Sequence, residues 1–190
     1  MKSKIKLIID AHESKHFSIA SVGLEENKVI SGNDASAQII SKIEEIIPNF
    51  KSEEISEIII NLGPGSLTGL RIGSSIAQGL ALGLESHSQL NKNIKVKGLS
   101  LWDVIFEEYP EIVVLFYTGT KKWIQKTKTE ETIKELDQIK ETSSKWISNK
   151  PEKLPFSNNS QEFPNIIKLM QKHHEKAKED INLLYPVTMF

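Results

Sequence analysis

The sequence has no cysteine and only one arginine, Arg71, among its 24 basic residues. The lack of cysteine excludes disulfides, thiolate zinc sites and cysteine nucleophiles, and it is typical of a reducing compartment. No apolar run reaches membrane-spanning length, and no signal peptide is recognisable before Asp10. Because the net charge is only -1, the chain has no overall basic field to hold nucleic acid. We therefore expect a cytoplasmic protein without a membrane partner.

Apolar runs and amphipathic stretches alternate along the first half of the chain. They predict the order strand, strand, strand, helix, strand, helix, strand, helix, at about residues 4–10, 16–22, 29–30, 34–48, 55–62, 66–84, 94–98 and 99–108. The first of these helices has one apolar face, formed by Ile39, Ile40, Ile43, Ile46 and Ile47. This order is typical of an α/β fold, with a lobe boundary near residue 100.

The second half is less regular and predicts a smaller lobe over residues 101–190. We expect a strand over 112–117, a charged helix over 130–140, a polar loop over 151–164 and a helix over 164–178. The apolar tail after Ile181 is expected to pack back on the body of the protein. A basic strand around Trp123 carries Lys121, Lys122, Lys126 and Lys128; we interpret it as an edge strand protected by lysines rather than as a contact for RNA.

Residues 63–73 (GPGSLTGLRIG) carry Gly63, Gly65, Gly69 and Gly73, which indicates a backbone that turns sharply and approaches other atoms closely. The segment is no phosphate-binding P-loop, because it lacks the lysine and hydroxyl pair, and its spacing departs from the dinucleotide fingerprint. The lone Arg71 within it suggests a planar, bidentate contact that lysine cannot make.

Small residues then recur every fourth position along the predicted helix, at Gly69, Gly73, Ala77 and Ala81. Each glycine inside a helix costs about 0.5–1 kcal/mol relative to alanine, so close contact along this stripe must offset the cost. Two explanations stay open: packing on the chain's own sheet, or an interface with another subunit. Anion binding by the amides of residues 65–67 is a third use of the helix start.

Residues 12–16 match the H-E-x-x-H pattern of zinc proteases, with His12, Glu13 and His16 in place. That chemistry needs both histidines on one face of a helix, whereas the flanking residues read as strands. We therefore interpret the match as a chance occurrence in a hairpin turn, and a zinc-dependent hydrolase is the alternative function. Asp10 is interpreted as a turn-capping residue, with a weak claim to nucleotide binding.

The segment 63–73 closely resembles the signature of the TsaB (YeaZ) family, and the strand ending at Asp10, residues 17–20, 77–84 and 97–101 resemble neighbouring segments of that family. The resemblance implies an actin/Hsp70-like (ASKHA) fold of two ribonuclease H-like lobes, the second short and degenerate here. This chain has Asp10-Ala11-His12-Glu13 where the family has Asp-Thr-Ser-Thr. That difference argues against nucleotide binding by the isolated chain, and a nucleotide-binding enzyme acting alone is a further alternative.

The resemblance also implies a function. It implies a non-catalytic partner of a TsaD-type subunit, in the complex that forms N6-threonylcarbamoyladenosine at position 37 of tRNAs reading ANN codons. A TsaE-type ATPase would join, the chain could form a homodimer through the same helices, and tRNA would be met only indirectly. ATP or ADP and metal would be held by the partner subunits, with no cofactor on this chain alone. The residues expected at the loop or interface are Gly63, Gly65, Ser66, Thr68, Gly69, Arg71, Gly73, Ala77, Ile39 and Ile43.

Overall fold

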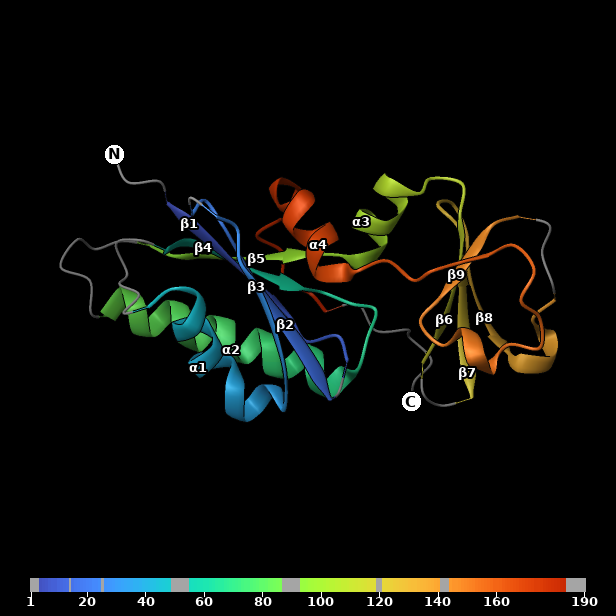
Figure 1. Cartoon of the computed structure of the whole chain (residues 1–190), viewed down its shortest axis with the longest axis horizontal. Helices are drawn as coiled ribbons and strands as arrows, with labels where there is room; N and C mark the ends of the chain where they lie inside the picture. Colours follow the sequence, from blue (N-terminus) through green and yellow to red (C-terminus); the bar gives the residue numbers. More distant parts are fainter. Residues whose placement is uncertain are drawn as a thin grey trace. The chain divides into compact units, whose positions relative to one another are not determined.

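The computed structural model describes residues 4–13, 15–24, 26–48, 55–86, 93–118, 121–140 and 144–183. The chain forms two compact units (Figure 1). Among the described residues, the first unit contains the chain up to Leu101 together with residues 166–183, and the second contains Trp102–Asn165. The first unit is therefore built from two separate stretches of the sequence.

The sheet of the first unit has the strand order β3-β2-β1-β4-β5. β2 pairs antiparallel with both β3 and β1, whereas β4 pairs parallel with both β1 and β5. The strands are β1 (Ile5–Asp10), β2 (His16–Val22), β3 (Val29–Asn33), β4 (Ile55–Asn61) and β5 (Lys95–Leu99). Because β1 and β4 run parallel as neighbours, their carboxyl ends meet at one edge of the sheet.

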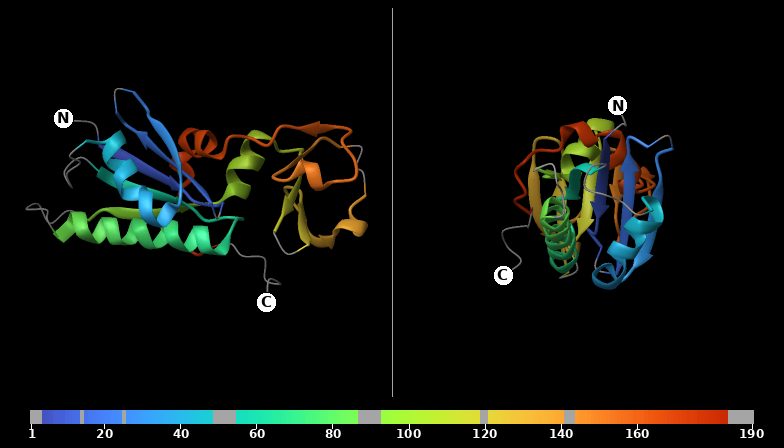
Figure 2. Two further views of the ribbon diagram at one scale, coloured as in Figure 1. Left: turned by 60° about the horizontal axis from the view of Figure 1, so that its bottom comes forward. Right: turned by 90° about the vertical axis from the view of Figure 1, so that its left-hand side faces the viewer.

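Helices cover both faces of this sheet (Figure 2). One face is covered by α1 (Ala35–Ile46) and α2 (Leu67–Ser86), and the other by α4 (Ile166–Lys172), which is followed by the short 3-10 helix η3 (His174–Lys176). Alternate residues of a strand point to opposite faces, so Leu7 and Ile9 join α1 and α2 in one apolar cluster. The long apolar runs of β1 and β4 follow from burial on both faces.

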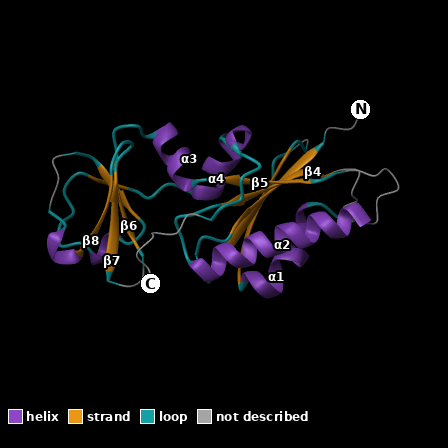
Figure 3. Ribbon diagram, turned by 180° about the vertical axis from the view of Figure 1, so that it is seen from behind, coloured by secondary structure: helices purple, strands orange, loops and turns teal. Residues whose placement is uncertain are grey.

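The second unit has its own five-stranded sheet, in the order β10-β9-β6-β7-β8 (Figure 3). The strands are β6 (Val113–Tyr117), β7 (Lys122–Lys126), β8 (Glu131–Glu135), β9 (Trp146–Ser148) and β10 (Ser160–Gln161). The remaining elements are α3 (Leu101–Glu108) and two 3-10 helices, η1 (Leu136–Gln138) and η2 (Pro151–Lys153). Leu115, Trp123 and Trp146 form the core of one face of this sheet.

The α/β class and the order of elements in the first half are confirmed, whereas three expectations for the second half differ from the structure. The charged stretch 130–140 is no helix: β8 pairs antiparallel with β7, and η1 follows it. β7 lies between β6 and β8, so the lysine-bearing strand is not an edge strand. The helix expected over 164–178 is shorter, because α4 ends at Lys172. Ile181 and Leu183 pack against the core of the first unit, and residues 184–190 lie outside the described residues.

Across the described ranges, no helix combines the length and the apolar character needed to cross a bilayer.

Candidate functional site at the ends of strands β1 and β4

Asp10 is the last residue of β1, and Asn61 is the last residue of β4. The crevice at the carboxyl ends of parallel strands is where open α/β sheets bind ligands. Both side chains are buried, with exposed fractions of 4% and 3%. A buried carboxylate is costly unless it is paired and hydrogen-bonded, so its partners decide what this edge can do.

Both oxygens of the Asp10 carboxylate contact groups of the same chain. The Nδ1 atom of His12 lies 2.8 Å from Oδ1 and 3.0 Å from Oδ2 of Asp10. The Asn61 amide donates from Nδ2 to Oδ1 at 2.7 Å, and the backbone N–H of His12 donates to the same oxygen at 3.2 Å. We call Asp10, His12 and Asn61 the carboxylate latch. The turn-capping role expected for Asp10 is present, but it is only one of its four contacts.

The pKa values of the pair move in opposite directions. Burial by itself raises the pKa of Asp10, but the His12 imidazole and the Asn61 amide outweigh it and hold that pKa below its ordinary value. Burial likewise lowers the pKa of His12, whereas the neighbouring Asp10 carboxylate, with a smaller contribution from Glu13, raises it overall. Each shift favours the charged form of its group, and the two charges stabilise one another.

The glycine loop is tied to the same latch. Asn61 accepts through Oδ1 from the backbone N–H of Gly63 at 2.7 Å, and Gly63 has a φ of 104°, in the left-handed region that side chains disfavour. The N–H of Ser66 donates to the carbonyl of His12 at 2.6 Å. A Cβ atom at Gly65 would lie 2.5 Å from that same carbonyl oxygen. The Ser66 amide is thus used within the chain and does not point to an anion.

The stripe of small residues on α2 packs on the chain's own sheet. Gly69, Gly73, Ala77 and Ala81 are all buried. A Cβ atom at Gly69 would lie 2.1 Å from the carbonyl oxygen of Ala11, and one at Gly73 would touch the Ala11 methyl group at 3.4 Å. Internal packing therefore accounts for these residues, and the interface expected along this stripe is not available.

Two further interface residues are also corrected. Ile39 and Ile43 of α1 are fully buried in the core of the first unit, so neither can line a surface for another protein. Of the loop residues, Gly63 is buried and Gly65 and Ser66 are half-buried, whereas Thr68 is exposed. The Ser66 hydroxyl accepts from the backbone N–H of Gly69 at 3.3 Å, which caps the start of α2.

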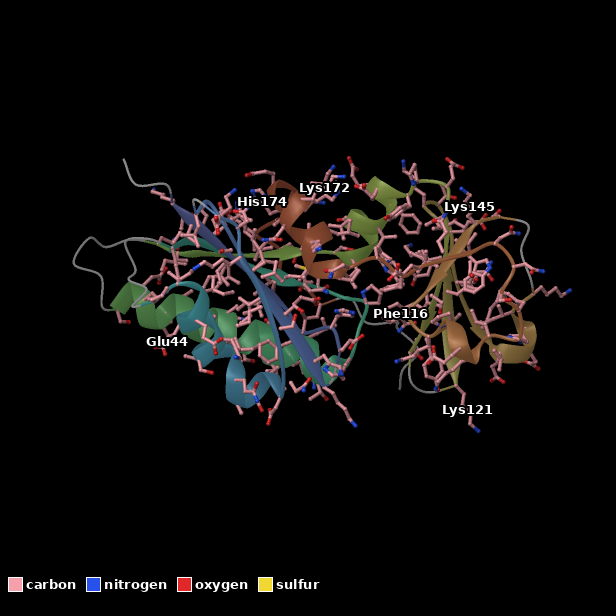
Figure 4. All side chains as sticks on the ribbon, in the orientation of Figure 1. Glu44, Phe116, Lys121, Lys145, Lys172 and His174 are labelled. Carbon is pink, nitrogen blue, oxygen red and sulfur yellow. The ribbon has the colours of Figure 1, made fainter. Side chains whose placement is uncertain are left out.

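The opposite face of α2 is the exposed one. Leu82 is 66% exposed, and Cβ atoms at Gly79 and Gly83 would meet nothing within 4 Å. Arg71 is exposed on α2, and among the described side chains its guanidinium forms no ion pair. On α1, Ile40 is 46% exposed, and Glu44, one turn later, points away from the sheet (Figure 4). We call the exposed residues Arg71, Gly79, Leu82 and Gly83 of α2 with Ile40 and Glu44 of α1 the outer helical face.

The H-E-x-x-H segment lies in the hairpin between β1 and β2 and not on a helix. His12 binds Asp10, while His16 begins β2 and hydrogen-bonds through Nδ1 to the amide oxygen of Asn33. The two histidines therefore face different partners, and the described part of the chain brings together no group of three side chains suited to a metal ion. The geometry that zinc hydrolysis requires is absent from this segment as described.

The sequence correctly predicted Asp10 at the end of a strand and His12 in the hairpin turn. It predicted neither the contact between these two side chains nor the part that Asn61 plays in the site. The available signal was an aspartate and a histidine two residues apart at the end of a buried strand. Asn61, at the end of the neighbouring parallel strand, was the second signal. The exposure of Leu82 and Ile40 could not be read from a pattern in which most apolar positions are buried.

Comparisons with known proteins agree with this architecture. A family model described as TsaD: tRNA N6-adenosine threonylcarbamoyltransferase matches residues 30–154, more than half of the 190-residue chain. A search of curated proteins gives no match. The structure of YeaZ from Pseudomonas aeruginosa is similar with a TM-score of 0.61 and 15% identity, over 96% of this chain and 100% of that one.

A second structure, titled as an uncharacterized protein with similarity to peptidase YEAZ from Pseudomonas aeruginosa, gives a TM-score of 0.61 and 14% identity. It covers 98% of this chain and 100% of that one. At these identities the likeness shows the fold. The chain has the fold of the YeaZ structures and belongs to the TsaD family of tRNA N6-adenosine threonylcarbamoyltransferases.

Proposed function

We propose that this chain is a non-catalytic subunit of the assembly that forms N6-threonylcarbamoyladenosine in tRNA, and that it binds a TsaD-type catalytic subunit through the outer helical face. The match over residues 30–154 supports the pathway. A TsaE-type ATPase would join the assembly, and ATP and metal would be held by those partners. The chain would act from the cytoplasm, without a direct contact to position 37 of the tRNA.

The carboxylate latch is the observation that carries the non-catalytic role. A carboxylate that binds a metal or a phosphate-bound metal needs free oxygen lone pairs facing the ligand. Both oxygens of Asp10 are occupied, by the His12 imidazole at 2.8 and 3.0 Å and by the Asn61 amide at 2.7 Å. The His12 imidazole, whose pKa is raised by Asp10, lies where a catalytic metal would otherwise contact the carboxylate.

The outer helical face supports the partner role. Large apolar side chains exposed at 66% and 46% leave apolar area in water, which contact with another protein would remove. The bare backbone at Gly79 and Gly83 lets a second helix approach closely. Arg71 and Glu44 add one charge of each sign, so the partner surface should carry a carboxylate opposite Arg71 and a cation opposite Glu44. A second copy of this chain could use the same face when the partner is absent.

The test is binding of the TsaD-type subunit from the same organism to the full chain, measured by calorimetry. Gly79→Trp and Leu82→Arg change only the outer helical face, so both should weaken binding more than tenfold while the free chain keeps its fold. Lys168→Trp adds the same bulk to the exposed side of α4, on the other face of the sheet, and should leave the affinity within about twofold. Unchanged affinity in both α2 variants would contradict the proposal.

Substitution of Arg71 gives a more specific test, because lysine keeps the positive charge but lacks the planar guanidinium group with its paired N–H donors. Arg71→Lys should lose much of the affinity that Arg71→Gln loses, if the guanidinium binds a carboxylate in a bidentate manner. Catalytic status is tested separately by transfer of the threonylcarbamoyl group to tRNA. The isolated chain should give no product, and the mixture with the TsaD-type subunit should give more than that subunit alone.

A further inference from the structure

A cavity of about 760 Å³ lies within the second unit, and all of its lining residues belong to that unit. Its floor is formed by Tyr117 of β6 and Trp123 of β7, which are cross-strand partners with ring centroids 5.1 Å apart. Leu136 of η1 and Pro155, just after η2, supply apolar walls. A cavity of this size with an aromatic floor is typical of sites for drug-sized ligands.

The aromatic floor is held rigidly. Trp123 is only 1% exposed and is packed into the core of the unit. The backbone of Tyr117 is clamped by one side chain: its N–H donates to Oδ1 of Asn149 at 2.7 Å, and its carbonyl accepts from Nδ2 of Asn149 at 3.2 Å. The backbone that carries the Tyr117 ring is thus held in place, so little affinity is lost to ordering it when a flat ligand stacks on the ring.

Two lysines at the cavity can bind an anion. Lys121 and Lys153 line it, both are exposed, and neither forms an ion pair within the described part of the chain. Figure 4 shows Lys121 at the turn that leads into β7, extending away from the sheet. The ammonium group of Lys153 lies 4.0 Å from the centre of the Tyr117 ring, a cation–π contact in place of a salt bridge.

Two acidic residues also line the cavity, but they leave room for an anion. The Glu135 carboxylate caps η1 by accepting a hydrogen bond from the backbone N–H of Gln138, so part of its capacity to accept hydrogen bonds is already used. Asp137 remains as an acceptor. A ligand that suits all of these groups has a flat ring, an anionic group, and hydroxyl or amino donors.

We propose that this cavity binds a nucleotide, with its base on the Tyr117 ring and its phosphate between Lys121 and Lys153. Stacking of a base on a fixed aromatic ring is stronger than a solvent-exposed cation–π contact, so the base displaces Lys153 from the ring. The released ammonium group then lies free to pair with the phosphate, and Asp137 accepts from ribose hydroxyls or a base amino group. The same chemistry is offered by a free mononucleotide and by an unpaired nucleotide of an RNA. The site does not depend on the partner role proposed above.

The experiment titrates the full chain with adenosine 5′-monophosphate, adenosine, inorganic phosphate and a short single-stranded oligoadenylate, using calorimetry. The monophosphate should bind with a Kd of about 1 mM or tighter. Adenosine and phosphate should each bind at least about fivefold more weakly, because each lacks one half of the contacts. Oligoadenylate that binds at least tenfold more tightly than the monophosphate identifies RNA as the source of the ligand, and equal affinity identifies the free nucleotide.

Variants assign the binding to the cavity. Lys153→Gln changes an exposed side chain and leaves the core intact. It should weaken the binding of the monophosphate at least about fivefold. Tyr117→Leu should weaken it at least about tenfold, with circular dichroism to confirm the fold. Lys128→Gln, an exposed lysine in the β7–β8 turn, is the matched control and should stay within twofold. The proposal is overturned if the monophosphate does not bind, if phosphate alone binds as tightly, or if Lys153→Gln behaves like the control.

Discussion

At the scale of single residues, the carboxylate latch is a buried ion pair whose removal leaves a charge without its partner. Breaking such a pair on one side is far more costly than replacing both members, because the remaining charge stays out of water. Asp10 is 4% exposed and would keep only the Asn61 amide and the His12 backbone N–H. The stability of the first unit should therefore depend on the charge state of His12.

The first prediction concerns pH. Because the pKa of His12 is raised, its contribution to the free energy of unfolding is complete below about pH 6.5. That contribution is lost as the pH rises through the raised pKa. Because the pKa of Asp10 is lowered, its contribution to the free energy of unfolding is complete above about pH 4. That contribution is lost as the pH falls through the lowered pKa. His12→Gln should thus lower the free energy of unfolding by about 3–5 kcal/mol between about pH 4.5 and 6.5, and by less at high pH.

Urea unfolding of the full chain across this pH range measures the difference. His16→Gln is the matched histidine control: the His16 side chain is exposed and hydrogen-bonds to Asn33, so its loss should change the unfolding free energy by about 0.5 kcal/mol or less. A loss in His12→Gln that stays constant with pH would show that the imidazole acts as a neutral hydrogen-bond donor and not as a cation.

The latch also shows what residue patterns could and could not predict. The turn at Asp10 was predictable, because aspartate commonly bonds to a backbone N–H two residues later. The imidazole contact was not, because His12 was equally part of a zinc-protease pattern, and only the hairpin geometry separates His12 from His16. The role of Asn61 depends on the parallel pairing of β1 and β4, which brings together residues 51 positions apart.

At the scale of elements, α2 divides its glycines between two opposite faces, and the two sets should respond to substitution with opposite signs. Gly69→Ala would put a methyl group 2.1 Å from the Ala11 carbonyl oxygen and should destabilise the chain by about 1–3 kcal/mol. Gly79→Ala meets nothing within 4 Å and should stabilise it by about 0.5–1 kcal/mol, because alanine restricts the unfolded chain.

Thermal unfolding of the two single variants tests this pair directly. Gly83→Ala repeats the gain expected at Gly79, since its Cβ atom would also meet nothing. Equal effects at Gly69 and Gly79 would mean that helix propensity alone governs the helix and that the close approach to Ala11 carries no cost.

The contrast between α2 and β8 shows where the periodicity of apolar residues is enough to predict secondary structure. Helix α2 was predictable because its small and apolar residues keep a helical period over many turns. In β8 the apolar and charged residues fit a helix equally well, and the pattern gave the wrong answer. Pairing with β7 decides the outcome, because Ile133 lies opposite Ile124 and Lys134 opposite Trp123. Tertiary pairing of this kind overrides local propensity.

At the scale of the whole molecule, the first unit is completed by a segment that lies more than sixty positions further along the chain. Ile166, Ile167, Leu169 and Met170 of α4 are buried on the sheet face opposite α1 and α2. Gln171 adds a hydrogen bond from Nε2 to the carbonyl of Ser21 at 3.1 Å, and the backbone of Lys178 pairs with Gly98 at the β5 edge. The sheet is buried on both faces only when this segment is in place.

Apolar burial, and not the surface ion pairs, should hold this segment on the sheet. Met170 is fully buried, so Met170→Ala should lower the free energy of unfolding of the first unit by about 2–5 kcal/mol. Glu175 pairs with Lys6 at 2.6 Å but is 74% exposed, and water and salt screen such a pair, so Glu175→Gln should leave the unfolding midpoint nearly unchanged. Urea unfolding followed by far-UV circular dichroism separates the two. If Glu175→Gln cost as much as Met170→Ala, charge pairing rather than burial would fix the segment, and raising the salt concentration should then release it.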